Sequence, residues 1–153
     1  MNISFRPIKA EETTFRNKIL QQELRDSKCP YKIEEEYPLV LSSCENIYSY
    51  GLFHDSTPST VLAHANFLPR NIINSDGETL ERVALIGNVM SHPDHRKKGL
   101  VRLLFDKLIN LASTKDISNL ILWSDLAGFY EKLKFQPFGS EQRFIFHKNN
   151  FPK

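Results

Sequence analysis

Apolar residues alternate with polar ones, or run together, in several short segments of the chain, and both patterns are typical of β-strands. Turn-forming residues separate the second from the third segment and, at Asn74–Gly77, the third from the fourth, which favours hairpins. The fourth segment contains Gly87, which indicates a bulge inside the strand. The predicted strands are residues 2–8, 47–54, 60–69, 83–91 and 119–123.

Other segments place apolar residues three or four positions apart, as on one face of a helix. In the clearest of them, Leu100, Leu104 and Leu108 share a stripe with Leu111 and Ala112. The predicted helices are residues 10–26, 99–113 and 126–133.

The order of these elements predicts the fold class. The middle helix joins two strands as a crossover, which makes those strands parallel, whereas the short turns make the earlier strands antiparallel. We therefore expect an α/β fold over residues 1–153. It is a single domain with a mixed, mostly antiparallel sheet, a central parallel β-α-β unit and flanking helices. Residues 28–46 are expected to be irregular, and residues 135–147 have strand character with a turn at Gly139–Ser140.

The composition is that of an ordinary globular protein, with 41% hydrophobic and 25% charged residues in 153. The formal charge of +2 is far from the basic excess of a dedicated nucleic-acid binder. No apolar run approaches the ~20 residues of a membrane helix, and the first residues lack the apolar stretch of a signal peptide. We expect a cytoplasmic protein that binds neither nucleic acid nor membrane.

Neither the cysteines nor the histidines form a motif. Cys29 and Cys44 lie apart and are expected to be reduced thiols in a cytosolic chain. His92 and His95 lie three positions apart, but Pro93 stands between them and no further ligand is near. No metal site is expected.

The segment from Val89 to Arg102 carries the candidate chemistry. A strand ends there, a tight loop follows, and a helix starts at Gly99. The first amides of a helix have no internal partners and favour anions, and a glycine lets a phosphate approach the backbone. Lys97 and Lys98 add positive charge. The pattern predicts a phosphate-bearing ligand at the end of a parallel strand, although a basic surface loop before an ordinary helix would share it. The P-loop and dinucleotide glycine motifs are absent.

This loop resembles the pyrophosphate loop of the GNAT superfamily of N-acetyltransferases, Arg/Gln-x-x-Gly-x-Gly/Ala. Residues 96–101, RKKGLV, fit at the first and fourth positions, and Val101 departs from the small residue at the sixth. A second family signature, Phe-Tyr-x-x-x-Gly-Phe, is similar to residues 129–135, where Lys134 replaces the glycine. One helix and one strand separate the two signatures, as in the family, and the resemblance covers residues 80–138.

The resemblance implies an acetyl-CoA-dependent N-acetyltransferase in which an amine attacks the thioester directly, without a covalent acyl-enzyme. Acetyl-CoA, as co-substrate, would enter between strands 83–91 and 119–123. Its pantetheine arm would bind the end of the first of these strands and its pyrophosphate the loop. The implied cofactor-binding residues are Val89, Met90, Ser91, Lys97, Lys98, Gly99, Leu100, Val101 and Arg102.

For catalysis the resemblance implies Tyr130 as the acid that protonates the leaving thiolate. By residue type alone, Tyr130 would simply pack beside Phe129. Asp125 is expected either to cap the last helix or to act as a base or anchor for the substrate amine. Glu81 is a weaker candidate base.

Several alternatives remain open at this point. The departures at Val101 and Lys134 fit a degenerate GNAT domain that binds CoA without catalysis. Segments 36–39 and 45–46 resemble the N-terminal domain of the enhanced intracellular survival branch. The acceptor is a small-molecule or protein amine. The family fold has two strands after the last helix, so within residues 135–153 both are short or one is missing. A homodimer would then complete the sheet, or the chain would be one part of a longer protein.

Overall fold

The computed structural model describes residues 2–41 and 47–139. The chain divides into two compact units, residues 1–123 and 124–153. The first unit holds all the strands found in the described residues and most of the helices.

A five-stranded sheet in the order β1-β2-β3-β4-β5 is the centre of the first unit. Strands β1 to β4 pair antiparallel, and β5 pairs parallel to β4. The predicted mixed sheet and its parallel β-α-β unit are confirmed. The strands are β1 (Ile3–Pro7), β2 (Ser49–His54), β3 (Thr57–Ile73), β4 (Thr79–Ser91) and β5 (Asn119–Ile121).

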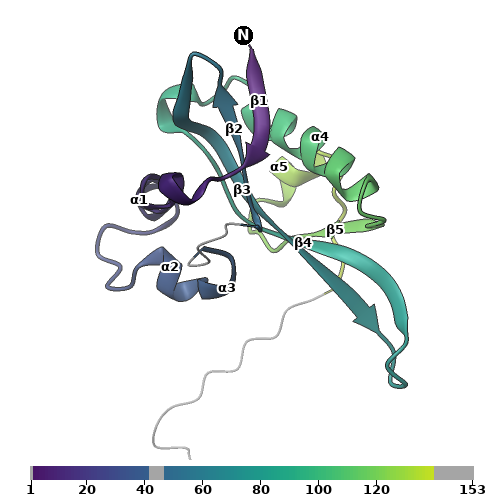
Figure 1. Cartoon of the computed structure of the whole chain (residues 1–153). Helices are drawn as coiled ribbons and strands as arrows, with labels where there is room; N and C mark the ends of the chain where they lie inside the picture. Colours follow the sequence, from purple (N-terminus) through teal and green to yellow (C-terminus); the bar gives the residue numbers. More distant parts are fainter. Residues whose placement is uncertain (1, 42–46, 140–153) are drawn as a thin grey trace, which may run out of the picture. The chain divides into compact units, whose positions relative to one another are not determined.

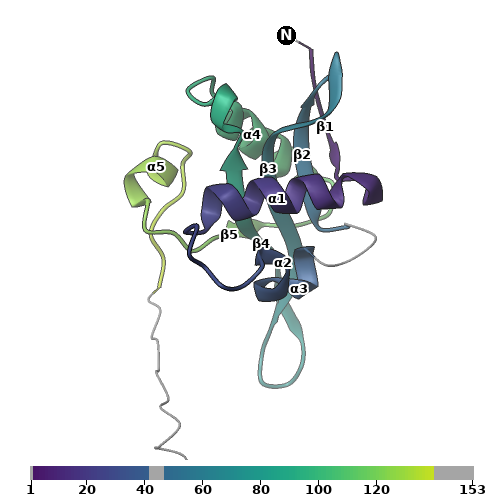
Figure 2. The ribbon, with the colours of Figure 1, turned by 90° about the vertical axis from the view of Figure 1, so that its left-hand side faces the viewer.

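Helices lie on both faces of this sheet. Helix α4 covers one side, while α1, α2 and α3 lie on the other (Figure 1). Figure 2 shows α1 running across the strands. The prediction of an irregular 28–46 segment is wrong for its described part, because α2 and α3 form there. The helices of this unit are α1 (Thr13–Leu24), preceded by the 3₁₀ turn η1 (Ala10–Glu12), α2 (Ile33–Glu36), α3 (Pro38–Leu41) and α4 (Leu100–Ser113).

The apolar face of each long helix is buried against the sheet. On α4, Leu100, Leu104 and Leu108 are at most 5% exposed, as the stripe predicted, and Phe105 joins them. On α1, Leu20 packs into a cluster with residues of α2, α3 and the sheet. Each such side chain contributes roughly 1.5–3 kcal/mol relative to exposure.

The β3–β4 hairpin is longer than the pattern predicted, since it runs to Ile73 and restarts at Thr79. Its turn lies where it was predicted: the Asn74 side-chain oxygen accepts hydrogen bonds from the amides of Asp76 (3.0 Å) and Glu78 (2.8 Å). Pairing of β4 with β5 begins only at Val83, so the hairpin extends as an arm beyond the sheet (Figures 1 and 2).

The second unit contains the short helix α5 (Ala127–Glu131). This helix is shorter than the predicted 126–133, and Lys134, in the glycine position of the second signature, has a left-handed φ of 68°. The Phe135 amide bonds to the Tyr130 carbonyl (3.1 Å) and the Lys134 amide to the Glu131 carbonyl (2.9 Å). This is the Schellman pattern, and the Phe135–Tyr130 ring contact (5.9 Å) completes it.

Some predictions fall partly outside the described residues. Residues 135–139 form no strand, and the rest of the expected tail strand, with Ser140, lies outside the described residues. Cys29 is a free thiol, whereas Cys44 and the segment 45–46 also lie outside them.

Candidate functional site

A bulge interrupts β4 shortly before its end. The register steps from Asn66↔Gly87 to His64↔Met90, so Ala65 of β3 faces two residues of β4, Asn88 and Val89. The predicted bulge is confirmed, but the residue in the left-handed conformation is Asn88 (φ 49°) rather than Gly87. Asparagine tolerates this conformation better than most residues with a side chain.

Two side chains of β3 hold Asn88 in this conformation. Its Nδ2 donates to Oδ1 of Asn66 (2.8 Å), and its carbonyl lies 2.9 Å from Nδ1 of His64. Because a carbonyl only accepts, the His64 proton lies on Nδ1. Burial lowers the pKa of His64 to about 3, so the ring is neutral.

The polar contacts continue from Asn66 into the first unit. Its Nδ2 donates to Ser49 Oγ on β2 (2.9 Å), which in turn accepts from Arg16 of α1 (2.5 Å). Arg16 is fully buried, and this burial lowers its pKa to about 10. A continuous buried polar network therefore connects α1 to the bulge in β4.

Beyond the bulge, one edge of β4 is open. The β4–β5 pairing ends at Leu85↔Ile121, and β4 continues to Ser91. On the β3 side the strand end stays paired, since Ser91 faces Ala63 and the His92 amide bonds to the Leu62 carbonyl (2.8 Å). Among the described residues no strand pairs with β4 from Ile86 onward on its β5 side.

The loop after β4 leads directly into α4. It begins with the 3₁₀ turn η2 (Pro93–His95), and φ is positive at Lys97 (61°) and Gly99 (72°). Gly99 occupies the N-cap position, where its left-handed φ suits glycine. The Leu103 amide bonds to the Gly99 carbonyl (3.0 Å), so the helical ladder starts there. The amides between Gly99 and Leu103 belong to the first turn of the helix, where amides have no partner within the helix and favour an anion.

The charged side chains of the loop have different partners. Arg96 forms an ion pair with Glu23 of α1, which ties the loop to the end of that helix. The ammonium of Lys98 lies 3.3 Å from Nδ1 of His95. Lys97 and Arg102 are exposed. The positive charge predicted for this loop therefore faces solvent at the start of α4.

The implied cofactor-binding residues thus occupy two adjoining parts of the first unit. Val89, Met90 and Ser91 form the open end of β4, and Lys97 to Arg102 form the loop and first turn of α4. Leu100 is buried and anchors the helix start, while Val101 is half-buried.

Tyr130 lies on α5 in the second unit. Its ring packs edge-on against Phe129 (5.1 Å) and Phe135 (5.9 Å), as the packing interpretation predicted. Burial raises the pKa of its hydroxyl above the ordinary value, which keeps the proton in place at neutral pH.

The capping role expected for Asp125 is wrong. Leu126 occupies the N-cap position of α5, and it is the Ser124 hydroxyl that accepts from the Leu126 amide (3.0 Å). Asp125 is exposed. Glu81 lies toward the other end of β4 from the loop, where it accepts hydrogen bonds from Ser118 (2.7 Å) and Asn119, so its role is to join β4 to the start of β5.

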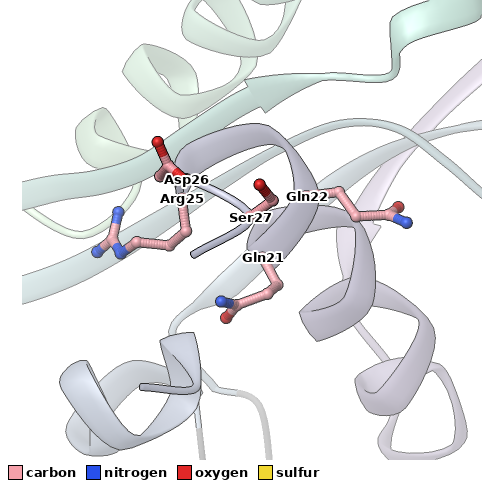
Figure 3. Close-up of a pocket in the computed structure, with 5 residues that line it drawn as sticks. All are labelled: Gln21, Gln22, Arg25, Asp26 and Ser27. Atoms are coloured by element: carbon pink, nitrogen blue, oxygen red, sulfur yellow. The ribbon is translucent and has the colours of Figure 1, made fainter. Parts of the chain in front are cut away.

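A shallow cavity of about 230 Å³ lies where α1 ends. Figure 3 shows its lining on the last turns of the helix and the segment that follows. Arg25 is fixed by a bidentate contact with Glu36 of α2, Nε to Oε1 (3.1 Å) and Nη2 to Oε2 (2.5 Å), and the Gln21 side-chain oxygen accepts from the Ile33 amide (2.7 Å). The lining residues are Gln21, Gln22, Arg25, Asp26 and Ser27.

Neither a metal-binding cluster nor a membrane-spanning helix occurs in residues 2–41 and 47–139. No group of three or more His, Cys, Asp or Glu residues there could hold a metal ion. No helix there is long and apolar enough to cross a membrane.

Comparison with known proteins assigns this chain to a family of enzymes. The family model described as acetyltransferase (GNAT) domain matches residues 4–138. The chain therefore belongs to the GNAT family of acetyltransferases, and it is an N-acetyltransferase, an enzyme that transfers an acetyl group to an amine. The comparison with curated proteins found no match.

Solved structures share the fold at low sequence identity. An acetyltransferase from Trypanosoma brucei is 20% identical with a TM-score of 0.70, covering 95% of this chain and 100% of that one. A protein from Clostridium acetobutylicum, described as a predicted acetyltransferase with acetyl-CoA, is 16% identical (TM-score 0.71; 94% and 96% covered). An aminoglycoside antibiotic 6′-N-acetyltransferase from Acinetobacter baumannii is 13% identical (TM-score 0.63; 99% and 100% covered).

Sequence reasoning missed the residues that hold the bulge. His64 and Asn66 are polar residues two positions apart in an otherwise apolar strand, and both are buried. That spacing places them on one face of β3, which was the available signal.

Proposed function

We propose that this chain uses acetyl-CoA as the acetyl donor and that the loop 92–99 with the start of α4 holds its pyrophosphate. The observation that carries the proposal is the left-handed Gly99 at the N-cap of a 14-residue helix. The adjoining amides are available to an anion, and Lys97 and Arg102 supply charge from exposed positions.

The open edge of β4 supports a place for the pantetheine arm. This arm carries amide groups, which can hydrogen-bond to a free strand edge as another strand would. Val89, the second residue of the bulge, lies on that part of β4 with Met90 and Ser91, directly before the loop. An arm bound there would lead to the pyrophosphate loop without a break.

For the chemical step we propose Tyr130 as general acid and Asp125 as general base or anchor for the amine. The amine nitrogen forms a bond to the acetyl carbonyl carbon, and the carbon–sulfur bond then breaks. The Tyr130 hydroxyl gives its proton to the departing sulfur, and Asp125 takes the proton that the amine loses. The raised pKa of Tyr130 supports this role because the hydroxyl stays protonated until the thiolate forms.

The acceptor class that we propose is a primary amine of a small molecule or a protein. The cavity at the end of α1 supports an approach from that side, because Glu23 in the same helix turn contacts Arg96 of the loop. Asp26 in the cavity lining offers a carboxylate to an ammonium group.

We further propose a cytoplasmic location, a homodimer and a single domain over residues 1–153. The proposal also keeps the relationship to the enhanced intracellular survival branch.

A second candidate is a GNAT domain that binds CoA without catalysis. Val101 and Lys134 favour it, because both stand where the family patterns have a small residue or glycine. The Schellman end at Lys134 nevertheless forms without glycine, so that departure leaves the local backbone intact.

Release of CoA thiol from acetyl-CoA in the presence of a panel of primary amines separates the two candidates. The panel holds polyamines, aminoglycosides, amino acids and lysine-containing peptides. We expect at least one amine to raise thiol release well above the rate without amine. Acetyl-CoA binding with no stimulation by any member would favour the non-catalytic domain.

A further inference from the structure

The contacts of Asn88 hold the bulge in β4 in shape. It adopts a left-handed φ of 49° immediately before Val89, the first implied pantetheine-binding residue. Both its carbonyl and its side chain are engaged on the β3 side, by His64 and Asn66. The backbone of Val89 is therefore set by the position of Asn88.

We propose that Asn88 and Asn66 are positioning residues for the pantetheine arm of acetyl-CoA, acting through the bulge in β4. This inference rests on the proposed binding of acetyl-CoA along β4. A bulge re-aims the strand that follows it. The Asn88–Asn66 hydrogen bond (2.8 Å) fixes that direction, so the Val89 and Ser91 backbone is held ready for the ligand.

The geometry of Asn66 shows why this hydrogen bond has one orientation. Its Nδ2 donates to Ser49 Oγ (2.9 Å) and lies near the carbonyls of Tyr48 (3.2 Å) and Val40 (3.3 Å). All three are acceptors, so the amide nitrogen must face them and the oxygen must face Asn88. Asn66 is 2% exposed, which leaves water little access to replace a lost partner.

His64 also contacts Asn88, from the next position on the same face of β3 as Asn66. In the bulge the Asn88 carbonyl bonds to the imidazole at 2.9 Å. The other ring nitrogen, Nε2, is buried with no hydrogen-bond partner among the described residues. The contact of the ring with the Asn88 carbonyl therefore holds the bulge from the same strand as the Asn66 contact does.

Replacing Asn88 by glycine tests the proposal with little risk to folding, because glycine adopts the same positive φ and only the amide side chain is lost. Binding of two ligands would be titrated calorimetrically: acetyl-CoA, and adenosine 3′-phosphate 5′-diphosphate, which is the nucleotide half without the pantetheine arm. We expect Asn88→Gly to lower the affinity for acetyl-CoA roughly tenfold, which is the effect of losing about one hydrogen bond. The nucleotide half should bind within about twofold of the unchanged chain.

Asn88→Asp is the second variant, since it keeps the shape and sets an oxygen against Oδ1 of Asn66. It should show the same selective loss. Asn71→Gly, the same change at an exposed position on the hairpin arm, is the matched control and should change neither affinity. Equal weakening of both ligands, or no weakening of either, would overturn the positioning role. Failure of the unchanged chain to bind acetyl-CoA would instead overturn the proposed function.

Discussion

Nδ1 of His64 lies 2.9 Å from the carbonyl oxygen of Asn88, and the imidazole is completely buried. A ring in this position cannot gain a proton without placing an unsolvated charge in the core. Burial accordingly lowers its pKa to about 3, well below the ordinary 6.5. The unfolded chain has no such restriction, so the two states bind different numbers of protons in acid.

The first prediction follows for stability in acid. The folded pKa lies below the unfolded one, so the stability associated with neutral His64 is complete above about pH 6.5 and is lost as the pH falls toward about 3. The loss approaches about 1.4 kcal/mol per pH unit. Urea unfolding from pH 7.5 to 4.5 measures it. In His64→Gln this part of the dependence of the free energy of unfolding on pH should disappear. His54→Gln, a change at the end of β2, should keep it. Equal slopes in all three proteins would contradict the attribution to His64.

The second prediction concerns the end of α5. Lys134 has a φ of 68°, which costs a side-chain-bearing residue about 1 kcal/mol. Lys134→Gly should therefore raise the free energy of unfolding by roughly that amount. Lys132, two positions earlier, has a φ of −65°, so Lys132→Gly should lower it. If both variants change the free energy of unfolding in the same direction, backbone strain at Lys134 is not the cause of the change.

The third prediction concerns Asp125. It does not cap α5, so Asp125→Asn should change the free energy of unfolding by less than about 0.5 kcal/mol. If Asp125 takes the proton of the substrate amine or anchors that amine, turnover should fall roughly 10²-fold or more. Ser124→Ala is the structural counterpart: it removes the hydroxyl that accepts from the Leu126 amide and should reduce stability. Full turnover in Asp125→Asn would assign the base elsewhere.

The fourth prediction concerns Tyr130. Tyr130→Phe keeps the ring contacts with Phe129 and Phe135 and removes only the hydroxyl. With the proton donor lost, kcat should fall roughly 10²-fold while acetyl-CoA affinity stays nearly constant. Tyr50→Phe, which removes a half-buried hydroxyl from β2, controls for the general effect and should leave kcat unchanged. An active Tyr130→Phe enzyme would exclude Tyr130 as the acid.

Much of the fold could be predicted from periodicity alone. The stripe of Leu100, Leu104 and Leu108 located α4 to within a residue, and the crossover rule gave the parallel pairing of β4 and β5. The short helices α2 and α3 could not be predicted in this way. Each is only a single turn, and contacts such as that of Arg25 with Glu36 fix them in place.

The candidate site was predictable only where it follows from local sequence. The loop before α4 is recognisable because strand, glycine and basic residues are adjacent in the chain. The Asn88–Asn66 contact joins residues 22 positions apart, and it depends on a register shift that a strand pattern does not specify. Asp125 shows the other limit: Ser124 and Asp125 are both good capping residues, yet the N-cap position falls on Leu126, and the Ser124 hydroxyl accepts from the Leu126 amide instead.

Binding of acetyl-CoA at the loop before α4 is the central claim, and calorimetric titration of acetyl-CoA into three chains tests it. The unchanged chain should bind. Gly99→Asp should not, because it places a carboxylate and a strained backbone where the pyrophosphate is proposed to lie. Gly77→Asp carries the same charge and similar strain (φ 83°) at the tip of the hairpin arm, and it should bind as the unchanged chain does. Undiminished binding by Gly99→Asp, or no binding by the unchanged chain, would contradict the account.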